Sequence, residues 1–190
     1  MADYLHYEDI SPGDSWASPA RTVLESDIGS FAGLTGDYDP LHVDFEHATN
    51  TPYGRPIAHG LLGLSFLAGL SSTCPRVRTL AFVRIEDWQF QKPVVSGDTV
   101  HVKTRVESMS PKGRRAGEVV WFRELVNQRG EVVQSGQIVT LVAAREFLPR
   151  KSVPTQAKLD QFRRIERATD LAEKVGMHKK SEIVRQSVED

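Results

Sequence analysis

The sequence predicts an α+β domain in which an antiparallel β-sheet wraps around one long buried helix, followed by a helical extension. Three observations support this prediction. The stretch Ile57–Leu70 is uncharged and glycine-spaced, alternating polar and apolar residues follow Pro75, and the composition changes after Pro149. We therefore expect one domain over residues 1–149 and a charged amphipathic extension over 150–190.

The composition is that of an ordinary globular protein. The chain has 190 residues, 39% of them hydrophobic, and its 24 Lys plus Arg nearly balance 25 Asp plus Glu. A chain of this length can bury about 70% of its unfolded surface, so it can form a substantial core. The near-neutral balance argues against a nucleic-acid partner.

The cysteine count, the N-terminal residues and the length of the apolar stretches bear on disulfide bonds and on the cellular compartment. Cys74 is the only cysteine, which excludes an intrachain disulfide. The first ten residues lack the basic and apolar regions of a secretory signal, and no apolar stretch approaches the roughly 20 residues of a membrane span. We expect a cytoplasmic protein without a membrane partner.

The N-terminal third is predicted to hold one strand and one helix before a long loop. A short strand is expected over Ser15–Val23 and a helix over Glu25–Thr35, with acidic residues in its first turn. Gly36 stands where a helix commonly ends in a left-handed residue. Residues 37–56 are expected to form a loop, with at most one helical turn at residues 45–49.

The central helix is predicted over Ala58–Leu70. It has no charged residue, so it should be buried on most sides. Gly60, Gly63 and Gly69 each lower helix stability by about 1 kcal/mol relative to alanine. This cost is reasonable where a sheet, a backbone or a ligand must approach the helix closely.

The second half of the chain is predicted to form successive antiparallel strands. In the first of them the apolar parity switches near Glu86–Asp87, which indicates a β-bulge or a strand buried on both faces. The others show β-type patterns, with a turn at Gly130. The expected strands cover Thr79–Phe90, Asp98–Ser108, Gly117–Asn127 and Gly130–Ala144.

The C-terminal extension carries apolar residues at helical spacing. We expect an amphipathic helix that packs on its own domain or on a partner subunit, in preference to a calmodulin-type or membrane-binding helix. The apolar stripe comprises Leu159, Phe162, Ile165, Ala168, Leu171 and Val175 and ends at Gly176.

Two motifs concentrate chemistry-bearing residues before and at the start of the central helix. The first is "FAGLTGDYDPLHVD" and the second is "TPYGRPIAHGLLGLSFLAGL". Together they resemble the signature of the MaoC-like, (R)-specific enoyl-CoA hydratase family of hotdog-fold proteins. The resemblance in motif covers Phe31–Leu70, and the strand order fits the same fold through about Ala144. This chain departs from the family pattern at Asp39, where asparagine is usual.

The resemblance implies an activity and a set of partners. The expected reaction is the reversible hydration of a trans-2-enoyl-CoA to an (R)-3-hydroxyacyl-CoA, or the reverse dehydration, in fatty acid metabolism. This is hydro-lyase chemistry on an acyl-CoA substrate and implies no metal or redox cofactor. A homodimer or higher homo-oligomer is also expected, because pairing would cover the exposed sheet edge and complete the acyl-CoA cleft.

The resemblance also assigns the site residues. Asp37 and His42 form the acid–base dyad, and both can face one cleft because Pro40 stiffens the loop between them. Gly60 is the oxyanion-hole candidate, since the start of a helix has free N–H groups and a glycine lets a carbonyl oxygen come close. His59 either contributes to substrate binding or holds the start of the helix through hydrogen bonds.

Other interpretations of these residues remain open at this stage. Asp37 could serve only as a turn residue and His42 as an ordinary loop histidine. A metal site built from Asp37, Asp39, His42 and His59 is not expected, because no HxH or HExxH spacing is present. Alternative functions are an acyl-CoA thioesterase and a non-catalytic acyl-CoA-binding protein. Weak candidates for contacts to the CoA phosphates are Arg55, Arg84 and Lys92.

Overall fold

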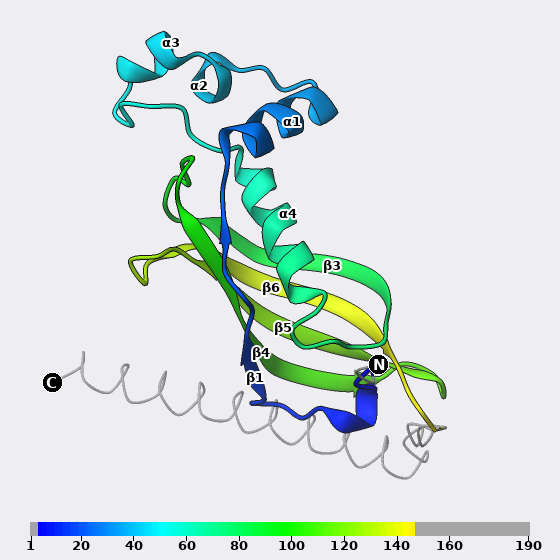
Figure 1. Cartoon of the computed structure of the whole chain (residues 1–190). Coiled ribbons are helices and arrows are strands. Elements are labelled where there is room, and N and C mark those ends of the chain that lie inside the picture. The colour runs from blue at the N-terminus through cyan, green and yellow to red at the C-terminus, as the bar shows by residue number, and fades with distance from the viewer. Residues whose placement is uncertain (1–3, 147–190) are drawn as a thin grey trace, which may run out of the picture. The chain divides into compact units, whose positions relative to one another are not determined.

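The computed structural model describes residues 4–146, which fold as one antiparallel sheet with a long helix across one face (Figure 1). The sheet order is β1-β4-β5-β6-β3, and β2 pairs separately with β4. The strands are β1 (Ser15–Ala17), β2 (Arg21–Thr22), β3 (Thr79–Phe90), β4 (Thr99–Pro111), β5 (Ala116–Val126) and β6 (Val132–Ala143). The helices are α1 (Glu25–Thr35), α2 (Pro40–Val43), α3 (Phe45–Thr49) and α4 (Gly60–Ser71), preceded by a 3-10 turn at Tyr7–Asp9.

The central helix expected from the sequence is α4. It begins at Gly60, two residues later than expected, because His59 still has a non-helical ψ of 137° and serves as the N-cap. Figure 1 shows α4 lying across the sheet, with α1, α2 and α3 gathered near its N-terminal end. The predicted arrangement of a sheet around one buried helix is therefore confirmed, and it places the start of α4 beside the long loop.

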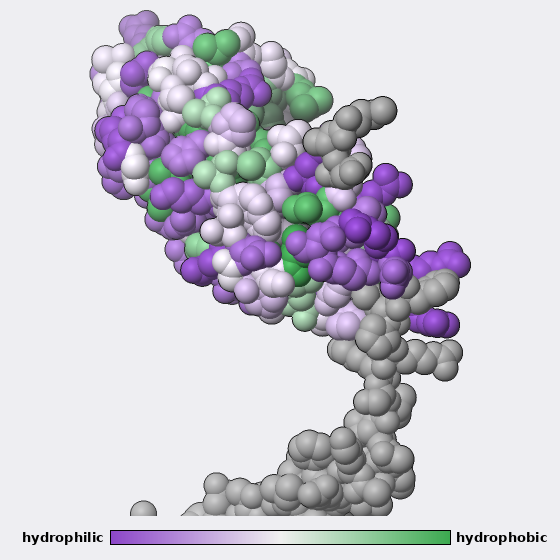
Figure 2. Space-filling view, turned by 60° about the horizontal axis from the view of Figure 1, so that its bottom comes forward, coloured by the Kyte–Doolittle hydropathy of each residue, from purple (hydrophilic) through white to green (hydrophobic). Residues whose placement is uncertain are grey.

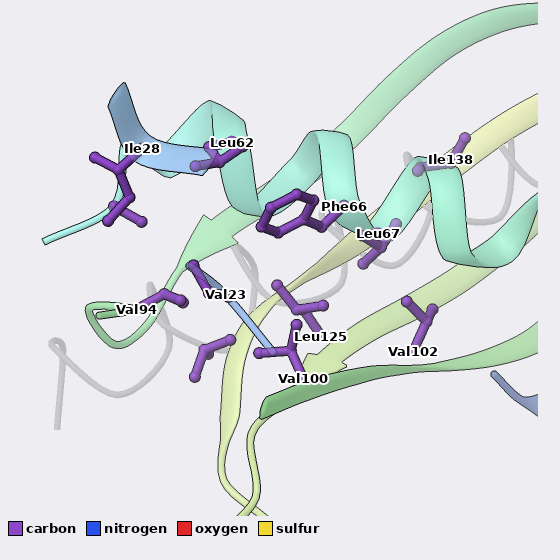
Figure 3. Close-up of a cluster of buried hydrophobic side chains, with 12 residues drawn as sticks. Val23, Ile28, Leu62, Phe66, Leu67, Val94, Val100, Val102, Leu125 and Ile138 are labelled. Carbon is purple, nitrogen blue, oxygen red and sulfur yellow. The ribbon is translucent and has the colours of Figure 1, made fainter. Parts of the chain in front are cut away.

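The main core lies between α4 and the sheet. In Figure 3, Phe66 and Leu67 extend from α4 toward the valines of the strands. Val100 and Val102 are fully buried on alternate positions of β4, as the sequence pattern predicts. Burying a side chain such as Leu67 contributes about 1.5–3 kcal/mol, so this face of α4 is strongly held.

The segment between α1 and α4 contains more helix than the sequence indicated. α1 ends at Thr35, and the C-cap Gly36 adopts the predicted left-handed conformation with φ of 79°. Residues 40–43 then form α2, where only loop was expected. The Asp39 carboxylate caps this helix by accepting a hydrogen bond from Leu41 N at 2.9 Å. Pro40 occupies the first helical position, where a backbone N–H would have no partner within the helix, so its absence costs no hydrogen bond. Asp44 caps α3 in the same way.

The strand expected over Ser15–Val23 is in fact two short strands. β1 and β2 both pair with β4, but Pro19 lies between them and cannot donate to a ladder. Farther along, the bulge expected in β3 is confirmed. Asp87 has a positive φ of 50°, and the register with β6 shifts between Glu86 and Gln89.

The alternative expectation that β3 is buried on both faces is wrong. β3 is the last strand of the sheet, and most of its side chains are exposed. They include Leu80, Phe82, Val83 and Ile85, each about half exposed. A long apolar edge strand of this kind offers unpaired backbone groups to another strand.

The rest of the surface is mixed. Figure 2 shows hydrophobic residues interspersed with hydrophilic ones over the face that it presents. Within residues 4–146, no helix is long and apolar enough to cross a membrane. The amphipathic helix expected in the 150–190 extension lies outside the described residues, so that expectation stays a prediction.

Candidate active site

His42 is held by its backbone environment in a defined tautomer. It lies in α2, and its Nδ1 is 2.7 Å from the carbonyl oxygen of Ile57. A carbonyl oxygen can only accept, so Nδ1 must carry the proton. The neutral imidazole therefore presents Nε2 as an unprotonated nitrogen, which is the form a general base requires.

His59 is the buried N-cap of α4 and stacks on His42. Only 4% of its surface is exposed, and the two rings lie with centroids 3.8 Å apart and planes 29° apart. Its Nε2 lies 2.9 Å from the backbone carbonyl oxygen of Asp37, so by the same reasoning Nε2 is the protonated nitrogen. The contact ties the loop after α1 to the start of α4.

Asp37 completes the group from the loop side. Its carboxylate is 54% exposed, and its Oδ2 lies 3.9 Å from His59 Nε2. One ligand-type atom from each of Asp37, His42 and His59 lies within 4.8 Å of the others. The structure therefore brings together the two residues of the expected dyad, although no direct hydrogen bond joins their side chains. A separation of this size leaves room for one water or substrate atom between them.

Gly60 provides an unused backbone donor beside this cluster. It is the first residue of α4, and its N–H has no acceptor among residues 4–146. The position is also tightly packed: a Cβ built there would lie 2.9 Å from Cε1 of Phe90. The Gly60 carbonyl accepts a hydrogen bond from Gln134 Nε2 at 2.9 Å, which fixes the orientation of the first peptide of the helix.

His42, His59 and Gly60 face a common cavity, and Asp37 lies close to the two histidines without being among its lining residues. A space of about 270 Å³ is lined by His42, His59 and Gly60, with Phe90 and Lys92 among the other lining residues. A second cavity, of about 160 Å³, lies on another side of His42. An imidazole, a free amide and an apolar wall thus border one accessible space, which is suited to binding a polarised carbonyl and transferring protons.

The cluster also has the donor types of a metal site. Imidazole nitrogen and carboxylate oxygen bind many divalent cations. However, His42 Nδ1 and His59 Nε2 already contact backbone carbonyls. Only the remaining ring nitrogens and the Asp37 carboxylate would be available to a cation. The expectation that the site uses no metal stays a prediction.

The three weak candidates for CoA phosphate contacts are all engaged elsewhere. Arg55 donates to the Ser96 carbonyl at 3.1 Å. Arg84 forms ion pairs with Glu86 and Glu118, and Lys92 pairs with Glu131. Of these cations only Lys92 borders the 270 Å³ cavity, so it is the best placed to meet an anionic group there.

Sequence reasoning missed two residues of the site. Gln134 on β6 and Phe90 at the end of β3 contact Gly60 from far along the chain. The signal for Gln134 was a polar residue inside an otherwise apolar strand. Nothing in the local pattern links it to α4, because that contact depends on how the sheet packs.

Comparison with known proteins identifies the fold family. The sequence matches the model of the MaoC like domain over residues 10–123. The chain belongs to the MaoC-like family. An (R)-specific enoyl-CoA hydratase from Rhodospirillum rubrum is 37% identical over 142 residues, which cover 74% of this chain and 94% of that relative.

Solved structures agree with this assignment. A MaoC-like dehydratase from R. rubrum superposes with a TM-score of 0.65 at 28% identity, covering 74% of this chain and 98% of that one. A conserved hypothetical protein from Mycobacterium tuberculosis with a double hotdog fold gives 0.68 at 20% identity, over 77% of this chain and 46% of that one. The fold is therefore the hotdog fold, and this MaoC-like chain is a hydro-lyase.

Proposed function

We propose that this MaoC-like enzyme catalyses the reversible hydration of a trans-2-enoyl-CoA to an (R)-3-hydroxyacyl-CoA, with Asp37 and His42 as the acid–base dyad. One observation carries the proposal. One ligand-type atom from each of Asp37, His42 and His59 lies within 4.8 Å of the others, close enough for one water molecule to contact both the Asp37 carboxylate and the His42 ring. The similarity to a named enoyl-CoA hydratase supports the choice of substrate.

The proposed mechanism gives the dyad and the Gly60 N–H separate roles. A water molecule held by Asp37 and His42 loses a proton to the dyad as its oxygen bonds to C3 of the enoyl thioester. The C2–C3 π electrons move to the thioester carbonyl, and the Gly60 N–H stabilises the negative charge on that oxygen. The dyad then returns a proton to C2, so the product has gained one water. Dehydration follows the same steps in reverse.

His59 has a positioning role in this proposal. Its protonated Nε2 holds the Asp37 carbonyl, and its ring supports the stacked ring of His42. It keeps His42 at the cavity and Asp37 close beside it, without taking part in proton transfer. Gln134 acts similarly on Gly60, because it fixes the peptide next to the N–H that would meet the substrate oxygen.

The test is hydration of crotonyl-CoA, followed as loss of the 2-enoyl absorbance. Asp37→Asn and His42→Asn should each lower kcat/KM by about 10²–10⁴, the usual contribution of a positioned acid or base. The asparagine at 42 can still donate to the Ile57 carbonyl, so the loop anchor is retained. His47→Asn, at an exposed position of α3, is the matched control and should keep full activity.

Three outcomes would contradict the proposal. Hydration at the wild-type rate by His42→Asn would remove His42 from the mechanism. Release of free CoA from saturated acyl-CoA, without hydration of enoyl-CoA, would identify a thioesterase. Tight binding of acyl-CoA with no turnover, unchanged in Asp37→Ala, would instead indicate a non-catalytic binding protein.

We also propose that the enzyme assembles as a homodimer through β3. This strand has no neighbour beyond β6 within residues 4–146, and it carries a row of half-exposed apolar side chains. Pairing of two such edges would satisfy their backbone groups and bury the apolar row. A cytoplasmic location, the absence of a cofactor, and a domain boundary near residue 150 complete the proposal.

A further inference from the structure

A third cavity lies at the opposite end of α4 from the candidate active site. It measures about 220 Å³ and shares no lining residue with the cavity at His42. Ala68, Ser71 and Ser72 border it from the C-terminal end of the helix, whereas Gly60 is the first helical residue. At 1.5 Å per residue, the two ends of α4 are separated by roughly 16 Å.

A buried arginine lines this cavity without an acidic partner. Arg123 on β5 is only 6% exposed, and no carboxylate within residues 4–146 forms an ion pair with it. Its hydrogen-bond partner is the Ser71 hydroxyl, at 2.8 Å from Nη1, and its buried Nε has no partner. Burial lowers the pKa of Arg123 to about 10, so the side chain is still charged at neutral pH.

The surroundings only partly compensate this charge. Ser71 Oγ donates to the carbonyl of Leu67, so the guanidinium is linked through the hydroxyl to the C-terminal end of α4. A helix C-terminus supplies about half a negative charge. The Trp121 ring, whose centroid is 5.5 Å from the Arg123 guanidinium carbon, adds a weak cation–π contact. A full negative charge is still missing next to a guanidinium with spare donors.

The rest of the cavity lining indicates which anion would fit. Ser72, Thr79 and Thr140 are among the residues that border the space, together with apolar side chains. The Thr140 hydroxyl already accepts a hydrogen bond from Trp121 Nε1 at 2.8 Å. Inorganic phosphate prefers several N–H donors, whereas a carboxylate needs few and can carry an apolar body against such walls. The apolar lining is formed by Ala68, Pro75, Val77, Phe82 and Trp121.

We propose that this cavity is a binding site for a small carboxylate with a short apolar body, with Arg123 as its anchoring residue. The volume is below the roughly 300 Å³ at which pockets for drug-sized ligands begin, so a short-chain acid is the appropriate size. Its carboxylate would accept from the guanidinium, and its chain would contact the aromatic wall. The site is independent of the proposed hydratase function, since it lies at the other end of the helix.

The test is calorimetric titration of the full chain with sodium hexanoate, 1-hexanol and inorganic phosphate. Hexanoate should bind saturably, and hexanol, which has the same chain without the charge, should bind at least about tenfold more weakly. Arg123→Met should weaken hexanoate binding by about 10- to 100-fold, the effect of losing a charge-assisted hydrogen bond. Arg105→Met, which removes an exposed arginine of β4, should leave hexanoate binding unchanged.

The side chain of Arg123 in the wild-type protein provides a second readout that does not depend on the variant folding. Its Nε–H resonance should shift with hexanoate concentration and follow the calorimetric binding curve. The proposal is overturned if hexanoate does not bind, if it binds equally to Arg123→Met, or if phosphate binds at least as tightly. An Arg123 resonance that hexanoate leaves unmoved would also overturn it.

Discussion

The three glycines of α4 occupy different surroundings, which allows one helix to provide both a test and its controls. A Cβ added at Gly69 would meet no atom within 4 Å. One at Gly60 would lie 2.9 Å from Phe90 Cε1, and one at Gly63 would overlap the Gln134 amide. The same substitution, glycine to alanine, should therefore have three different effects.

Gly69→Ala should stabilise the protein and leave activity intact. The position is inside the helix and open, so the gain is the helix propensity difference of about 0.5–1 kcal/mol. Gly63→Ala should destabilise it by about 1–3 kcal/mol. The added methyl displaces the Gln134 amide, which is buried and would lose its hydrogen bond to the Gly60 carbonyl.

Gly60→Ala should affect catalysis far more than stability. The Phe90 side chain is 55% exposed, so its ring can move away from the new methyl at small cost. The methyl would nevertheless stand in the cavity that Gly60 and Phe90 both line, where the substrate carbonyl must approach the N–H. Loss of one oxyanion contact corresponds to about 10²–10³ in kcat/KM, or about 3–4 kcal/mol.

The assays are crotonyl-CoA hydration and denaturant unfolding of all three variants. The reasoning about the oxyanion hole is refuted if Gly60→Ala turns over at the wild-type rate while Gly69→Ala shows its expected gain in stability. Equal loss of activity in Gly60→Ala and Gly69→Ala would also refute it, because only the first alanine would reach the cavity.

Two other features give predictions. Ile85→Lys should shift the protein from dimer to monomer in sedimentation velocity, because a charge would interrupt the apolar edge of β3. Leu34→Lys, at an exposed position of α1, is the control and should leave the dimer unchanged. A dimer that persists in Ile85→Lys contradicts pairing through β3. Hydrogen bonds from Asn127 and from two cationic side chains lower the pKa of Glu131 from 4.5 to about 2. A lowered carboxyl pKa stabilises the fold above pH 4.5, and the benefit is lost as the pH falls toward 2. The difference in free energy of unfolding between wild type and Glu131→Gln should therefore be present at pH 7 and disappear near pH 2. A difference that does not depend on pH would contradict this link between the Glu131 pKa and stability.

The fold was largely predictable because its main elements have strong local signals. An uncharged stretch with glycines marked α4, and alternating valines marked β4. Errors occurred where a single residue controls the backbone. Pro19 divides the expected first strand, and the Asp39 cap with Pro40 creates a helical turn where loop residues seemed sufficient.

The site was predictable only in its local part. Asp37 and His42 lie close in sequence, and a short, stiff segment keeps them close in space. The stacking of His42 on His59 requires the start of α4 to fold back against α2, and no spacing rule gives that arrangement. The contact from Gln134 depends on the register between β6 and its neighbours, which is fixed only when the whole sheet forms.

The two stacked histidines differ in the nitrogen that the backbone leaves free, and this difference supports the separate roles proposed for them. The Ile57 carbonyl accepts a hydrogen bond from the Nδ1–H of His42, which leaves Nε2 as the unprotonated nitrogen of the neutral ring. The Asp37 carbonyl accepts a hydrogen bond from the Nε2–H of His59, which leaves a buried Nδ1 without a partner. A base that must exchange protons with water needs an accessible nitrogen, and only His42, which is not fully buried, has one. These backbone contacts therefore support the proposed role of His42 in proton transfer. For His59, where the sequence left substrate binding and positioning both open, they favour positioning of the loop.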